Sequence, residues 1–246
     1  MNDVSQLILY EDNHLVVALK PSRMLTQGDA TGDLDLLSLL KAYIKEKYQK
    51  PGEAYLGLVH RIDRPVGGLL VFARTSKAAA RLSEQIREHT LAREYVLVCA
   101  GVTPARFQLA DYLVKDPQTN MVRVLPRHLR LQGKEAVLFG QTIAFNDEKS
   151  LVAIRLKTGR AHQIRVQMAH FGHPLLGDAR YNKEGADGLI ALWGMRLSFA
   201  HPITGKAMAF VCAPGKMPGG YPQSTHFDPY PRELDGLERM WPDIAP

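Results

Sequence analysis

Short runs rich in valine, isoleucine, leucine and aromatic residues recur along the chain, and most are bounded by glycine, proline, asparagine or aspartate. Runs of this length and composition predict β-strands. The predicted strands span residues 7–10, 15–19, 56–59, 69–72, 94–100, 136–144, 151–156, 191–199 and 207–212. No glycine-rich phosphate loop follows any of them, and the chain has no internal repeat.

Three segments with helical periodicity interrupt the strands. The first is capped by Asp33 or Asp35 and runs to residue 48, the second is capped by Ser76, and the third follows Gly159 and ends at Gly172. Strands outnumber helices and do not alternate with them, which favours an α+β fold with a mixed, largely antiparallel sheet and flanking helices.

The C-terminal end differs in composition from the rest, because seven of the 15 prolines lie at Pro214 or later. We therefore predict one domain over residues 1–213 and a proline-rich extension over 214–246 that packs on it. Residues 232–241 are predicted to form a short helix in this extension, with Leu234, Leu237 and Met240 against the body of the protein.

The composition is that of a globular protein with a basic balance. Lysine and arginine number 31 against 25 acidic residues, which gives a net charge of +6 and indicates an anionic partner such as RNA. Cys99 and Cys212 lie in apolar runs and are predicted to be reduced thiols. The sequence shows neither a signal peptide nor an apolar run long enough for a membrane span, so we expect a cytoplasmic, monomeric protein that does not bind membranes.

The segment at 59–64 carries the strongest chemical signal, because Asp63 stands between Arg61 and Arg64 on a loop between two predicted strands. Arginine on both sides is expected to keep the carboxylate ionised. A solvated turn with loose ion pairs is the alternative reading of this segment alone.

A second dense segment spans residues 156–178 and includes Arg160, His162, Arg165 and His173. The amides of the turn at Gly159 and Arg160 are predicted to favour an anion. The histidines of this region do not predict a metal site, since no cysteine or carboxylate cluster completes a ligand set.

Taken together, residues 60–68 (HRIDRPVGG) and 158–166 (TGRAHQIRV) resemble the two signatures of the RluA-type family of RNA pseudouridine synthases. Matches at 9–21, 93–101, 133–136 and 197–205 follow in the family's order, so the resemblance covers roughly residues 7 to 213. It implies a pseudouridine synthase catalytic domain, in its compact form without an N-terminal S4 domain, that modifies transfer or ribosomal RNA after base flipping and needs no cofactor.

The resemblance also assigns roles to individual residues. It implies that Asp63 is the catalytic carboxylate, that Arg165 faces it, and that Tyr95 lies against the target base. It further implies that Arg61 enters the space left by the flipped nucleotide. Tyr95 read alone is equally a core residue of a strand, and Arg165 an ordinary ion-pair residue.

RNA contacts are predicted from basic side chains dispersed along the chain rather than from one patch, although each is equally a solvated surface charge. The candidates are His60, Arg61, Arg64, Lys157 and Arg160. Further basic residues that could contact RNA are Lys20, Arg23, Arg123, Arg127, Arg130 and Lys134.

The chain departs from the family pattern at Val66-Gly67, where Thr-Ser is usual, at Leu19, where asparagine is usual, and at Trp193-Gly194, where His-Ala is frequent. The missing hydroxyls beside Asp63 keep open a catalytically weakened relative that binds RNA as a chaperone or assembly factor. A hydrolase is a weaker alternative, because Glu53 is the one other carboxylate within ten residues of Asp63 and glycosidases need two.

Overall fold

A computed structural model of the protein describes residues 3–244, which divide into two compact units. The first comprises Met1–Ala92 and Gly194–Gln223, and the second comprises Arg93–Trp193 and Ser224–Pro246. The division predicted at residues 213 and 214 stays a prediction. No helix among the described residues is both long and apolar enough to cross a membrane.

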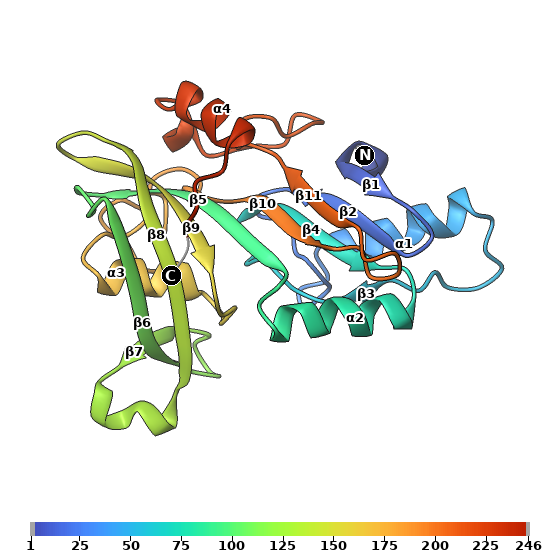
Figure 1. Cartoon of the computed structure of the whole chain (residues 1–246), viewed down its shortest axis with the longest axis horizontal. Coiled ribbons are helices and arrows are strands. Elements are labelled where there is room, and N and C mark those ends of the chain that lie inside the picture. The colour runs from blue at the N-terminus through green and yellow to red at the C-terminus, as the bar shows by residue number, and fades with distance from the viewer. Residues whose placement is uncertain (1–2, 245–246) are drawn as a thin grey trace. The chain divides into compact units, whose positions relative to one another are not determined.

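The first unit is built on a sheet in the order β1-β2-β4-β10, with β3 beside β4 and β11 beside β10 (Figure 1). Its strands are β1 (Ile8–Glu11), β2 (Leu15–Lys20), β3 (Gly57–Leu58), β4 (Gly67–Ala73), β10 (Leu192–Ala200) and β11 (Ala207–Val211). The pairs β1–β2, β2–β4, β3–β4 and β10–β11 are antiparallel. Every residue of β2 and β4 is buried, as expected for the central strands of a core.

Two helices flank this sheet, and a 3₁₀ turn, η1 (Val4–Leu7), precedes it. Helix α1 (Leu36–Lys47) begins at Asp35, whose side chain accepts a hydrogen bond from the amide of Ser38, so one of the two predicted caps is confirmed. Helix α2 (Ser76–Arg87) packs on β3 and β4. Its cap is Thr75 rather than the predicted Ser76, because Thr75 is extended and its hydroxyl accepts from the amide of Ala78.

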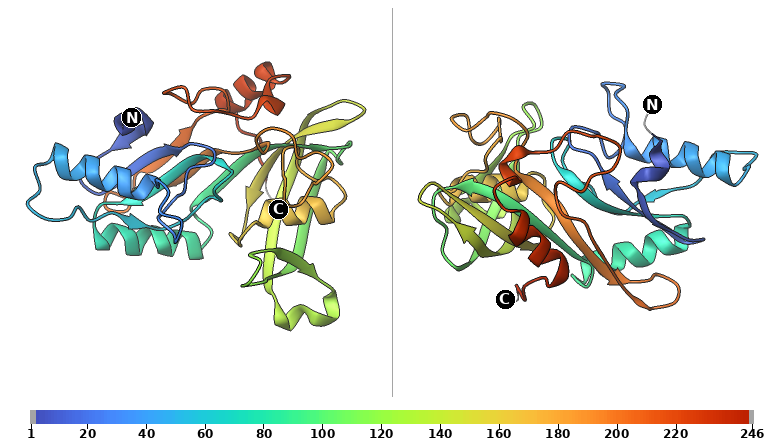
Figure 2. Two further views of the ribbon diagram at one scale, coloured as in Figure 1. Left: turned by 180° about the vertical axis from the view of Figure 1, so that it is seen from behind. Right: turned by 90° about the horizontal axis from the view of Figure 1, so that it is seen from above.

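The second unit contains an antiparallel sheet in the order β5-β9-β8-β6-β7. Its strands are β5 (Ala92–Ala100), β6 (Arg106–Lys115), β7 (Val122–Leu125), β8 (Lys134–Phe145) and β9 (Lys149–Leu156). Helix α3 (Gln163–His170) lies against β6 and β7. A 3₁₀ segment, η2 (Arg127–Gln132), forms most of the connection between β7 and β8 (Figure 2).

The C-terminal part of the second unit contains a 3₁₀ turn, η3 (Thr225–Phe227), and helix α4 (Pro231–Arg239). Leu234 and Leu237 are buried as predicted. The prediction for Met240 is wrong, because this residue follows the helix with an extended backbone and its side chain is 79% exposed. The α+β class with a mostly antiparallel sheet is confirmed.

Candidate active site

Asp63 lies half-buried in the loop that joins β3 to β4. Two hydrogen bonds shape the loop around it: the hydroxyl of Thr26 donates to the carbonyl of Ile62 at 2.9 Å, and the amide of Val66 donates to the carbonyl of Asp63 at 3.0 Å. The carboxylate is therefore carried on a closed turn whose backbone is fixed on both sides.

Lys20, at the end of β2, supports the same loop from within the core. Its side chain is fully buried, and its ammonium donates to the carbonyls of Pro21 at 2.9 Å, Met24 at 2.7 Å and Arg64 at 3.2 Å. Burial lowers the pKa of Lys20 to about 7, while the charge of Asp63 opposes that shift. The prediction that Lys20 contacts RNA is wrong, because its ammonium has no access to a ligand.

The residues on either side of Asp63 are placed differently from one another. Arg61 is exposed. Arg64 forms an ion pair with Asp33 at 2.7 Å and donates from Nε to the carbonyl of Arg23 at 3.2 Å. Its guanidinium thus pairs with Asp33 at the surface, and the expectation that Arg64 keeps Asp63 ionised stays a prediction. His60 is buried, and its Nε2 accepts a hydrogen bond from the amide of Val71 in β4 at 3.1 Å.

The loop enters β4 through a point where two backbones touch. Gly68 has a φ of +133°, and a Cβ atom at this position would overlap the backbone of Gly194 in β10. Only glycine meets both conditions without strain. Val66 and Gly67, which stand where the family usually has Thr-Ser, are both buried where the loop enters β4.

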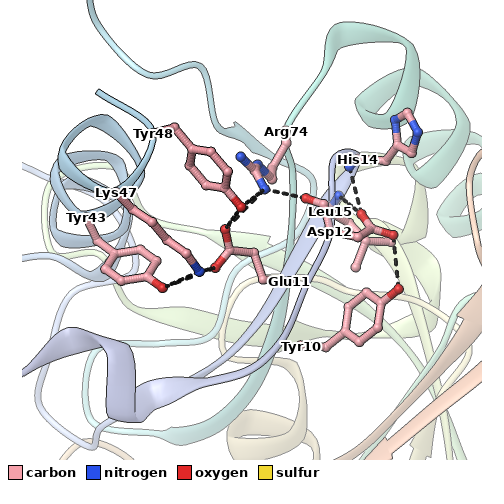
Figure 3. A network of polar contacts seen from close by, with 9 residues as sticks. All are labelled: Tyr10, Glu11, Asp12, His14, Leu15, Tyr43, Lys47, Tyr48 and Arg74. Carbon is pink, nitrogen blue, oxygen red and sulfur yellow. Dashed lines mark hydrogen bonds and ion pairs between the residues drawn. The ribbon is translucent and has the colours of Figure 1, made fainter. Parts of the chain in front are cut away.

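A polar network fixes the β1–β2 turn to α1 and to the end of β4 (Figure 3). Glu11 accepts hydrogen bonds from Lys47 at 2.8 Å and Tyr48 at 2.7 Å and pairs with Arg74 at 3.1 Å. Burial opposes ionisation of Glu11, but these donors outweigh it and hold the pKa of the carboxyl below its usual value. Arg74 also donates to the carbonyl of Asp12, so the network closes on the turn itself.

In the second unit, Arg165 projects from α3 into a buried ion pair. Its Nε donates to Oδ2 of Asp178 at 2.9 Å and its Nη2 donates to Oδ1 at 2.7 Å. The guanidinium also lies over the ring of Tyr181, 5.2 Å from the centroid. Contact on several sides leaves this arginine little rotational freedom.

The turn before α3 is held by Gln163. Its Oε1 accepts from the hydroxyl of Thr158 at 2.8 Å and from the amide of Arg160 at 3.0 Å, and its Nε2 donates to the carbonyl of Val137 at 3.1 Å. Arg160 further donates from Nε to the carbonyl of Glu135 at 2.8 Å. Gln163 therefore occupies the Arg160 amide, which is one of the donors of the predicted anion site, and the site itself stays a prediction.

The histidines of this region make contacts within the protein. Nδ1 of His162 lies 2.8 Å from the hydroxyl of Tyr181, and Nδ1 of His173 lies 2.9 Å from the carbonyl of Ala100. Over residues 3–244, no cluster of three histidine, cysteine or acidic side chains is arranged to hold a metal. His162 has a left-handed φ of +51° at the point where α3 begins.

Two further predicted site residues, Tyr95 and Lys157, lie in or next to strands of the second unit. Tyr95 is buried in β5 opposite Ile154 of β9, while Lys157 is exposed at the end of β9. Sequence reasoning missed the role of Asp178 as the partner of Arg165. The signal available was an aspartate close after α3, and spacing alone did not indicate that the two side chains meet.

Comparison with known proteins identifies the class to which this fold belongs. The human RNA pseudouridylate synthase domain containing 4 superposes with a TM-score of 0.72, covering 91% of this chain and 93% of that one at 21% identity. A second human protein, RNA pseudouridylate synthase domain containing 1, gives a TM-score of 0.66 at 19% identity over 83% of this chain and 82% of the other. The architecture is thus that of pseudouridylate synthase domains.

Sequence comparison then establishes the family. The RNA pseudouridylate synthase family model matches residues 14–170. Ribosomal large subunit pseudouridine synthase C of Buchnera aphidicola is 33% identical over 83% of this chain, and synthase D of Zymomonas mobilis is 34% identical over 85%. The chain belongs to the RNA pseudouridylate synthase family, as its RluA-type signatures predicted. It spans 66% and 69% of the lengths of these two relatives.

Proposed function

We propose that the protein isomerises uridine to pseudouridine in RNA, with Asp63 as the catalytic carboxylate. The reaction breaks the bond between C1′ of the ribose and N1 of the base, turns the base, and forms a bond from C1′ to C5. N1 ends with a proton and C5 loses one, so no electrons are exchanged. The observation that carries the proposal is the half-buried carboxylate on a loop tied to the core by Thr26 and Lys20.

We propose that Arg165 faces Asp63 and holds it ionised, as the family resemblance implies. The support on the protein's own side is that Asp178 fixes the orientation of Arg165 through two hydrogen bonds. Tyr95 is proposed to lie against the target base, where a buried aromatic ring can stack on it.

We propose that RNA is held by three exposed basic side chains, those of Arg61, Lys157 and Arg160, together with that of Arg64 in the Asp63 loop. Arg61 is proposed to fill the space left by the flipped nucleotide, since a guanidinium can stack on bases and bind phosphate. The burial of His60 and its bond from Val71 favour support of the loop over contact with RNA. The relatives named above are synthases of the ribosomal large subunit, so ribosomal RNA is the first substrate to test, with transfer RNA as the second.

The test is pseudouridine mapping. Purified protein is incubated with unmodified ribosomal and transfer RNA, and pseudouridine is located by carbodiimide-stop sequencing. Asp63→Asn is the test variant, and Asp147→Asn, on the exposed turn between β8 and β9, is the matched control. We expect product from the native protein and from the control, and none from Asp63→Asn.

Two other outcomes would contradict the proposal. RNA binding with no pseudouridine on any RNA would favour a catalytically weakened relative that only binds RNA. The loss of activity would then be assigned to the buried Val66-Gly67, which replace the usual hydroxyl side chains. Release of free uracil would favour a hydrolase.

A further inference from the structure

Arg93, at the start of the second unit, is a buried arginine whose side chain lacks a hydrogen-bond or ion-pair partner among the residues that the structure describes. The residue is only 9% exposed. Its Nε atom is enclosed and has no hydrogen-bond partner among residues 3–244. None of the ion pairs formed by the described residues includes it. A guanidinium stays charged at any physiological pH, so an unpaired one in this setting is costly.

The open side of Arg93 faces the turn before α3. A Cβ atom at Gly159 would overlap Nη1 of Arg93 and would lie 3.1 Å from Cζ and 3.2 Å from Nη2. Gly159 is itself exposed, and the guanidinium end of Arg93 occupies the space that a side chain at this position would need. The guanidinium end of Arg93 therefore lies beside an exposed turn, and a glycine is needed there to make room for it.

Arg93 also shares a face of β5 with Tyr95. Side chains two positions apart in a strand point to the same side of the sheet, whereas Glu94, opposite Arg155 of β9, points to the other side. The spacing between alternate residues in a strand is about 7 Å. A nucleotide base against Tyr95 would place its backbone within reach of Arg93.

We propose that Arg93 binds a phosphate of the RNA strand beside the nucleotide whose base lies against Tyr95. This inference rests on the proposed function, because it takes the anion to be part of the RNA substrate. The planar fork of a guanidinium matches two phosphate oxygens, and the surrounding protein shields the contact from salt. Arg93 would then position the strand, while Asp63 carries out the chemistry.

The experiment measures RNA affinity as a function of salt. Binding of a fluorescein-labelled RNA stem-loop is followed by fluorescence anisotropy from about 50 to 200 mM KCl for the native protein, Arg93→Gln and Arg106→Gln. Arg106 is exposed at the start of β6, so it controls for loss of one positive charge in the same unit. We expect Arg93→Gln to raise Kd about tenfold and to reduce the slope of log K against log salt by about 0.7 to 1, with little change for Arg106→Gln.

Two further variants separate phosphate binding from a structural role. Gly159→Ala keeps the charge but crowds the guanidinium, so it should weaken RNA binding as Arg93→Gln does. Arg93→Met removes an unpaired buried cation, so it should leave the melting temperature of the free protein unchanged or raise it. Unfolding of Arg93→Met, or an unchanged salt slope in a folded Arg93→Gln, would overturn the proposal.

Pseudouridine formation is mapped in parallel, which keeps the two proposals apart. If Arg93→Gln reduces the salt slope but the native protein forms no pseudouridine in RNA, Arg93 is an RNA contact and the proposed isomerase activity is rejected. Pseudouridine formation by the native protein with no change of slope in Arg93→Gln would reject the phosphate contact alone.

Discussion

Arg165 and Asp178 form a buried ion pair with two parallel hydrogen bonds, at 2.9 and 2.7 Å, and their side chains are 6% and 0% exposed. Oδ1 of Asp178 also accepts from the amides of Arg180 at 3.0 Å and Tyr181 at 3.3 Å. The carboxylate therefore fixes both the guanidinium of α3 and the turn that follows the helix. A pair this enclosed serves to orient Arg165 as much as to stabilise the fold.

Replacing Asp178 with asparagine should be strongly destabilising, because it leaves the charge of Arg165 buried with a weakened partner. We expect the free energy of unfolding to fall by about 3 to 5 kcal/mol, measured by urea denaturation. Asp147→Asn, which changes an exposed turn residue of the same unit, should change it by less than about 0.5 kcal/mol. Equal stabilities of the two variants would show that the ion pair contributes nothing measurable.

The N-terminal cap of α1 can be tested with two neighbouring aspartates. Asp35 accepts from the amide of Ser38 at 2.9 Å, so Asp35→Ala should cost about 1 kcal/mol of stability in thermal or urea denaturation. Asp33 forms an exposed ion pair with Arg64 instead, and Asp33→Ala should cost less than about 0.5 kcal/mol. A larger loss for Asp33→Ala would move the cap to that residue.

Glu11 should make the stability of the first unit depend on pH in the acid range. Its pKa in the folded protein lies below its ordinary value of 4.5, so the unfolded chain binds more protons between the two values. The stabilisation is thus complete above pH 4.5 and is lost as the pH falls through the folded pKa. Glu11→Gln should lower stability at pH 7 by about 1 kcal/mol.

The control for this prediction is Glu53→Gln, because Glu53 is 84% exposed in its pair with Lys45. Urea denaturation of both variants and the native protein at several pH values from neutral to acid makes the comparison. The deficit of Glu11→Gln should shrink as the pH falls, while Glu53→Gln should follow the native protein throughout. A deficit independent of pH would assign the effect to packing rather than to ionisation.

The α+β fold was predictable because strands such as β2 and helix α1 carry strong local patterns, including the correct cap at Asp35. Strand β6 was missed although its residues alternate, since few of its side chains are fully buried and its apolar signal is diluted by polar positions. Helix α3 was located, but all six residues from Gln163 to Met168 are buried, including three polar ones. No amphipathic pattern reveals such a helix surface.

The motif residues of the candidate site were visible in the sequence, but their supports were not. Lysine is almost never fully buried, so the exposed reading of Lys20 was the reasonable one. Its burial depends on three carbonyls, and the farthest of them, that of Arg64, is 44 residues from Lys20 in the sequence. The partnership of Arg165 and Asp178 likewise depends on the turn after α3. Tertiary contacts of this kind are not encoded in any local pattern.

Lys20 should give the stability a second dependence on pH, at the alkaline end. Burial lowers its folded pKa to about 7 from the ordinary 10.5, so folding releases a proton between these values. The unfolded chain binds more protons in this window, and the free energy of unfolding should therefore rise with pH from about 7 towards 10.

Lys20→Met should lose this rise, whereas Lys77→Met, at an exposed position of α2, should keep it. Urea denaturation at intervals across the window measures the slopes, and identical slopes for native protein and Lys20→Met would rule out Lys20 as the titrating group. The same variant leaves the carbonyls of Pro21, Met24 and Arg64 without their donor, so pseudouridine formation should fall even where the protein remains folded.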